Sequence, residues 1–177
     1  MTAALFQDWF FQHFVPEVKV YTEKNNLGFK ILFLIDNVPA HSCNFEHPNF
    51  RVEFLPPNTT SLIQPLDQGI IYTFKANYIK RAFKKIFDDT EENDSLTISQ
   101  VWKQFNIRDC LNIIASAITD IKKSTLNACW KSICPSIVLG NNNIESREPI
   151  NMEIINIARS IGGEGLEDLA INEIDKL

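Results

Sequence analysis

The chain has 177 residues, of which 45% are apolar and 22% are charged, a composition typical of one globular domain or of one domain with an appendage. The longest uninterrupted apolar run covers residues 31–35, far fewer than the about 20 residues that a membrane-spanning helix needs. The N-terminus has no basic region followed by an apolar core, as a secretory signal peptide would. We therefore expect an intracellular protein without a membrane span.

The formal net charge of −5 is concentrated in one part of the chain. Residues 141–177 contain eight acidic and three basic side chains, whereas residues 1–140 contain fourteen of each sign. This balance argues against a protein whose whole surface binds nucleic acid. It predicts an acidic, loosely docked tail over 141–177, with short helices at 150–160 and 164–176.

The four cysteines, at positions 43, 110, 129 and 134, include no Cys-x-x-Cys pair and are expected to be reduced thiols. His41, Cys43 and His47 lie close together in the sequence, but their spacing fits no standard zinc site. We interpret them as ordinary loop residues.

Residues 3–24 are predicted to form an amphipathic helix, because apolar side chains recur at three- and four-residue steps. Pro16 predicts a kink or a break in this helix. The segment 25–28 ends it, with Gly28 suited to a left-handed backbone position.

Two strands are predicted next. Residues 31–35 are continuously apolar, which indicates a strand buried on both faces of a parallel or mixed sheet. Residues 51–55 alternate charged and apolar side chains, which favours a strand nearer an edge with one wet face. Between them, 37–49 is expected to form a right-handed crossover with a short helical turn. Pro56 and Pro57 end the second strand.

A basic helix is predicted after the second strand. Pro65 suits the first helical position, which puts Asp67 in the first turn. No acidic residue occurs between 73 and 87, whereas five cations do: Lys75, Lys80, Arg81, Lys84 and Lys85. These cations indicate either a nucleic-acid-binding surface or the solvated face of a surface helix. Residues 88–95 are expected to form a loop or helix break, and 101–133 to be helical, with a separate short helix beginning near 125.

Two carboxylates stand at the ends of elements that are expected to be neighbours. Asp36 follows the first strand, and the helix terminus would keep Asp67 ionised. Ionised carboxylates that lie close together attract an oxygen-seeking divalent cation, as metal-assisted phosphoryl transfer requires. The alternatives are that Asp36 is a turn residue, that Asp67 complements the helix dipole, and that His41 forms a hydrogen bond within its loop.

Two motifs in this region are Leu34-Ile35-Asp36-Asn37-Val38-Pro39-Ala40-His41 and Phe54-Leu55-Pro56-Pro57-Asn58-Thr59-Thr60-Ser61-Leu62-Ile63-Gln64-Pro65-Leu66-Asp67-Gln68-Gly69. Together they resemble the DDE-superfamily transposase domain of Tigger/pogo elements, to which centromere protein B-like proteins are related. The resemblance covers roughly residues 1–135 and implies a ribonuclease H-like fold in which three acids bind two Mg²⁺ or Mn²⁺ ions. It implies that Asp36 and Asp67 are the second and third acids. Asn37, His41, Asn58 and Gln64, which belong to the same motifs, are expected to support the site.

The resemblance also implies that the chain corresponds to the C-terminal part of such a domain. The first three strands, the first acid and the DNA-binding helix-turn-helix of the family have no counterpart in it. We therefore expect an α/β, partial ribonuclease H-like fold with two parallel strands and flanking helices over 1–87. A helical extension over 88–140 and the acidic tail over 141–177 follow.

The expected function is that of a nuclear, transposase-derived protein that binds DNA weakly and without sequence preference. With two of three acids, very weak or absent endonuclease activity is predicted. The alternatives are a protein-interaction module that uses its apolar helices, or a relic without function, for which an unpaired strand edge predicts self-association.

Overall fold

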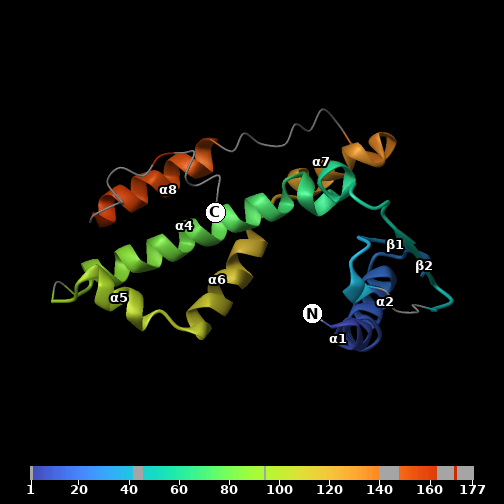
Figure 1. Cartoon of the computed structure of the whole chain (residues 1–177), viewed down its shortest axis with the longest axis horizontal. Helices are drawn as coiled ribbons and strands as arrows, with labels where there is room; N and C mark the ends of the chain where they lie inside the picture. Colours follow the sequence, from blue (N-terminus) through green and yellow to red (C-terminus); the bar gives the residue numbers. More distant parts are fainter. Residues whose placement is uncertain (1, 42–45, 94, 140–147, 163–169, 171–177) are drawn as a thin grey trace. The chain divides into compact units, whose positions relative to one another are not determined.

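The computed structural model describes residues 2–41, 46–93, 95–139, 148–162 and 170 (Figure 1). The chain divides into two compact units, Met1–Gln64 (unit 1) and Pro65–Leu177 (unit 2). Among the described residues, no helix is long and apolar enough to cross a membrane.

Unit 1 pairs a helical run with a small parallel sheet. Its elements are α1 (Ala3–Trp9), the π-helical segment η1 (Phe10–Phe14), α2 (Val15–Lys24), β1 (Ile31–Ile35), the 3-10 turn η2 (Pro39–His41), β2 (Phe50–Phe54) and α3 (Thr60–Ile63).

The helical run continues past Pro16 to Lys24 instead of breaking. Because proline has no backbone N–H, it disturbs the α-helical ladder on its N-terminal side. The wide π-helical segment Phe10–Phe14 lies directly upstream of it. The predicted end of the helix is confirmed, but the left-handed residue is Asn26, with φ of 54°, and not Gly28. Asparagine tolerates this conformation better than other residues that carry a side chain.

The two strands are parallel neighbours, as predicted, with Ile31 opposite Phe50 and Ile35 opposite Phe54. One face of this sheet packs on the helical run. The ring of Phe33 lies 5.6 Å from that of Phe10 and 5.0 Å from that of Phe14, measured between centroids. The prediction that β1 is buried on both faces is wrong, because Leu32, on the opposite face, is 59% exposed.

Unit 2 is helical and is built around one long helix, α4 (Ile70–Glu91). Figure 1 shows α8 along one side of α4, and α5 and α6 along another. Its other elements are the 3-10 turn η3 (Pro65–Gln68), α5 (Ile98–Gln104), α6 (Ile107–Thr119), α7 (Lys123–Ala128), the 3-10 turns η4 (Cys129–Ser132) and η5 (Pro135–Ile137), and α8 (Glu148–Ile161).

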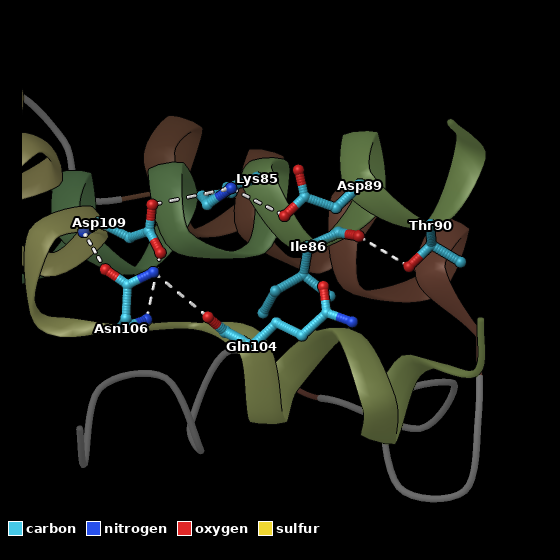
Figure 2. Close-up of polar contacts among 7 residues, drawn as sticks. All are labelled: Lys85, Ile86, Asp89, Thr90, Gln104, Asn106 and Asp109. Atoms are coloured by element: carbon cyan, nitrogen blue, oxygen red, sulfur yellow. Dashed lines mark hydrogen bonds and ion pairs between the residues drawn. The ribbon is translucent and has the colours of Figure 1, made fainter. Parts of the chain in front are cut away.

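The loop or helix break expected over 88–95 is present, but it begins only after Glu91, where α4 ends, and α5 begins at Ile98. The Thr90 hydroxyl donates a hydrogen bond of 2.7 Å to the Ile86 carbonyl within this last part of the helix (Figure 2). Residue 87, where we expected the first region to end, thus lies inside α4, and the division between the two units falls at Gln64. The separate helix expected near 125 is confirmed as α7.

The acidic segment contributes a helix that packs firmly against unit 2. In α8, Ile154, Ile155 and Ala158 are buried, and Ile154 and Ile155 pack in one cluster with Ala76 of α4. The Tyr72 hydroxyl donates a hydrogen bond of 2.7 Å to the side-chain oxygen of Asn151, which is also buried. The helix expected at 150–160 is therefore confirmed, and its expected loose docking is wrong. Nearly all of 164–176 lies outside the described residues.

Candidate carboxylate and nucleic-acid-binding sites

Asp36 directly follows β1, at the carboxyl end of the parallel pair. The turn η2 returns the chain so that Nδ1 of His41 lies 2.5 Å from Oδ1 of Asp36. The imidazole also packs on the buried ring of Phe6, with 4.2 Å between centroids. Since both side chains of the pair are about four-fifths covered, His41 holds the Asp36 carboxylate in one orientation.

Asp67 lies in the 3-10 turn η3 and not in the first turn of the following α-helix, which corrects the prediction. Gly69, with φ of 121°, separates the turn from α4, and glycine is suited to this conformation because it has no Cβ. The carboxylate of Asp67 is exposed and makes no hydrogen bond or ion pair within the described part of the chain.

The turn that carries Asp67 is fixed by the buried Cys129. Its thiol donates a hydrogen bond of 3.2 Å to the Gln68 carbonyl, and burial raises the pKa of the Cys129 thiol. Of the other cysteines, Cys110 and Cys134 are free thiols, as predicted, and Cys43 lies outside the described residues.

The two carboxylates belong to different units, Asp36 to unit 1 and Asp67 to unit 2. Both offer the oxygen ligands that Mg²⁺ and Mn²⁺ prefer, so the donor chemistry fits these ions. Within the described residues, no three His, Cys, Asp or Glu side chains gather into a metal-binding group. A metal ion shared by Asp36 and Asp67 therefore stays a prediction.

The expected supporting residues differ in what they do. His41 contacts Asp36, whereas Asn37 is exposed. Asn58 takes a left-handed conformation, with φ of 62°, in the turn after the two prolines. Gln64 ends α3, and its side-chain oxygen is buried without a hydrogen-bond partner in the described structure. Of these four residues, His41 contacts one of the two predicted acids, and Asn58 takes the backbone conformation that its turn requires.

Among the basic residues of α4, Lys80, Arg81 and Lys85 form ion pairs. The Arg81 guanidinium donates two hydrogen bonds to Asp120, of 2.7 and 2.8 Å, and Lys80 pairs with Glu153 of α8. Arg81 thereby holds the pKa of the Asp120 carboxyl below its usual value. Sequence reasoning missed both acids, because each comes from a helix distant in the chain.

Lys85 also forms ion pairs. Its ammonium group lies 2.8 Å from Asp89, one turn along α4, and 3.9 Å from Asp109 in the first turn of α6 (Figure 2). The hydrogen bond to Asp89 is the main cause that raises the pKa of Lys85. Lys75 and Lys84 are exposed, and Lys84 has no hydrogen-bond or ion-pair partner in the described parts of the chain.

The family model described as "DDE superfamily endonuclease" matches residues 1–130. The chain therefore belongs to the DDE superfamily endonuclease family, and the predicted Tigger/pogo relationship is confirmed.

Among its relatives, "Tigger transposable element-derived protein 7" of Homo sapiens is 33% identical over 147 residues, which are 75% of this chain and 26% of that protein. "Jerky protein homolog" of Homo sapiens is 26% identical over 148 residues, which are 81% of this chain and 24% of that protein. "CENP-B homolog protein 2" of Schizosaccharomyces pombe is 38% identical over 61 residues, 30% of this chain and 12% of that protein. The chain thus spans about a quarter of the length of the first two. No solved structure matches it.

Proposed function

We propose that this chain is a nucleic-acid-binding part of a transposase-derived, ribonuclease H-like endonuclease domain that acts in the nucleus. The observation that carries this proposal is the family match over residues 1–130, which includes both Asp36 and Asp67. The position of Asp36 beyond the carboxyl end of a parallel strand supports it, because functional groups of open α/β sheets gather there.

Asp36 and Asp67 are the proposed ligands of Mg²⁺ or Mn²⁺. Such an ion, when bound, stabilises the attacking and leaving oxygens of phosphoryl transfer. In this chain His41 orients the Asp36 carboxylate and shares one of its oxygens. Asp67 is exposed on a turn anchored by Cys129. Two carboxylates provide fewer ligands than the family's three acids, so we expect metal binding without DNA cleavage by this chain alone.

Calorimetric titration with Mn²⁺ tests the carboxylates. We expect the binding heat of the wild-type chain to fall strongly in Asp36→Asn and in Asp67→Asn, because each change removes a negatively charged ligand. Asp8→Asn is the matched control, since Asp8 is an exposed aspartate of α1. Equal Mn²⁺ affinity in the wild type and the two variants would exclude the proposed metal site.

DNA binding is proposed to use the exposed cations of α4. Lys75 and Lys84 are exposed, whereas Lys80, Arg81 and Lys85 are only partly exposed. Contacts of lysine with phosphate carry no sequence information. Weak, sequence-independent binding is therefore expected.

The salt dependence of duplex binding, measured by fluorescence anisotropy, tests this surface. The slope of log K against log salt changes by about 0.9 for each DNA phosphate that a cation neutralises. The double variant Lys75→Gln, Lys84→Gln should therefore have a slope shallower by about 2. Lys103→Gln, an exposed lysine on α5, should leave the slope unchanged. If the double variant kept the wild-type slope, α4 would not be the DNA-binding surface.

A second candidate function is protein binding through α5 and α6. Trp102, which is 54% exposed, stacks on Phe105 with 6.0 Å between ring centroids, and Ile107 beside them is also exposed. Exposed aromatic groups are enriched at protein interfaces. Sedimentation of the wild type and of Trp102→Ser would reveal self-association through this patch. A monomeric wild type at all concentrations would rule that mode out.

A further inference from the structure

Helix α6 has two apolar faces. One face is buried within unit 2 and includes Ile113, which is 8% exposed, and Ala117, which is fully buried. Cys110 on the same face accepts a hydrogen bond from the Tyr78 hydroxyl of α4. The other face is largely exposed in the described structure, and we name it the α6 stripe. Its members are Ile107, Leu111, Ile114, Ala115 and Ile118.

The α6 stripe leaves large apolar side chains in water. Ile107 is 73% exposed, Leu111 is 59% exposed and Ile118 is 55% exposed. Successive residues of a helix point about 100° apart, so the apolar residues of α6 cover a sector of about 200°, about twice the width that packing on one neighbour requires. Within the described residues, one side of this sector is covered and the other is not. The sequence of α6 is therefore that of a helix with neighbours on two sides.

The spacing along the α6 stripe indicates that the second neighbour is a helix. Its four large residues follow one another at steps of four, three and four positions: Ile107, Leu111, Ile114 and Ile118. This alternation is the a/d pattern of a coiled-coil seam, in which each side chain inserts between those of a facing helix.

The charges around the α6 stripe favour a second copy of this chain as the facing partner. No charged residue occurs between positions 110 and 119. A different partner is normally selected by opposite charges across the interface, and the stripe offers none. In a twofold dimer, by contrast, each surface meets its own copy. A charged face would then repel itself, whereas this neutral face does not.

The α6 stripe is also symmetric along its length. Ile107 and Ile118 lie equally far from its midpoint, and so do Leu111 and Ile114. We propose that the α6 stripe pairs antiparallel with the α6 stripe of a second copy of this chain. Ile107 then faces Ile118, Leu111 faces Ile114, and the twofold axis repeats both contacts. This inference rests on the second candidate function, protein binding through α5 and α6, and names the partner.

A seam along α6 alone makes a small interface. The helix has 13 residues, so it is about 20 Å long and about 10 Å wide. The contact therefore falls short of the about 800 Å² per partner that stable complexes bury. The dimer forms reversibly, with a dissociation constant on the order of 10–100 μM.

Sedimentation equilibrium of the full chain, at concentrations from about 1 μM to about 1 mM, tests the proposal. The wild type should show a monomer–dimer equilibrium. Leu111→Glu should weaken dimerisation at least about tenfold, because it buries an unpaired carboxylate from each copy in the seam. Since Leu111 is exposed in the single chain, the dilute variant should keep the wild-type melting temperature. Leu62→Glu, at an exposed leucine of α3 in unit 1, is the matched control and should dimerise like the wild type.

Mixing two variants tests the antiparallel orientation. Ile107→Glu and Ile118→Lys each place one charge at an end of the α6 stripe, and in an antiparallel pair these two charges face each other. The equimolar mixture should therefore dimerise several-fold more tightly than either variant alone. A mixture that associates no more tightly would overturn the antiparallel pairing.

A wild type that stays monomeric, or a dimer that Leu111→Glu leaves intact, would overturn the proposal. If Trp102→Ser dissociated the dimer and Leu111→Glu did not, protein binding through α5 would stand and the α6 stripe would fail. If the wild type were monomeric and Leu111→Glu lowered its melting temperature, the stripe would be covered within one chain, which also excludes the dimer. The proposed DNA binding is tested separately, by the salt dependence of duplex binding.

Discussion

Replacing Ile154 by alanine measures how firmly α8 belongs to unit 2. The Ile154 side chain is fully buried, at 0% exposure, against α4. Truncating a buried isoleucine costs about 2–5 kcal/mol, and the larger values apply where the surroundings cannot collapse into the cavity. Tyr72 and Ile150 beside it are only partly buried and can relax, so we expect about 3 kcal/mol. That is more than about a hundredfold in the unfolding equilibrium.

Urea unfolding followed by circular dichroism measures this destabilisation, and hydrogen exchange of the α8 amides shows whether the helix detaches locally. Met152→Ala is the matched control: Met152 lies on the same helix and is 45% exposed, so its truncation should cost no more than about 0.5 kcal/mol. Similar small effects for the two variants, with unprotected α8 amides in the wild type, would refute the firm docking of α8.

Three further predictions concern other parts of unit 2. Because Arg81 holds the pKa of Asp120 low, their ion pair stabilises the fold above about pH 4 and loses that effect as pH falls through the lowered pKa. The difference in melting temperature between the wild type and Asp120→Asn should therefore disappear in acid. A difference that stays constant with pH would contradict this. Burial raises the pKa of Cys129, so mass spectrometry should detect slower alkylation of Cys129 by iodoacetamide than of the half-buried Cys134; equal rates would contradict it. Asn106 accepts hydrogen bonds from two backbone N–H groups at the start of α6. Asn106→Ala should therefore lower the free energy of unfolding measured in urea by about 1 kcal/mol. An unchanged midpoint of urea unfolding would show that Asn106 does not stabilise the helix as a cap.

The elements of unit 1 were largely predictable, because local patterns define them. The apolar run 31–35 and the alternation over 51–55 correspond to β1 and β2 within a residue. The exposure of Leu32 was not predictable from the same run, since an apolar stretch does not reveal how many layers cover it.

The position of Asp67 was misjudged although a signal was present. Pro65 suits a helix start, but Gly69 four residues later permits a positive φ that interrupts the helix. The two residues together allow a short turn before a separate helix. Giving Gly69 as much weight as Pro65 would have placed Asp67 correctly.

The partners of the basic helix were beyond local reasoning. Arg81 and Asp120 are 39 positions apart in the chain, and Lys80 meets Glu153 from a segment whose composition indicated only a solvated tail. Counting charges along a sequence gives the net charge of a segment. It does not give the face on which each charge lies, and here that face decides which cations remain exposed.

The packing of α8 on α4 also constrains how this chain can vary. Ala76 is buried in the same cluster as Ile154, so a larger side chain at position 76 would overpack the contact unless position 154 became smaller. Substitutions at two positions in contact do not act independently. Among relatives that retain α8, the residues at positions 76 and 154 should therefore co-vary. Substitutions in the family-matched segment, residues 1–130, would then depend on substitutions in α8, which lies beyond that segment.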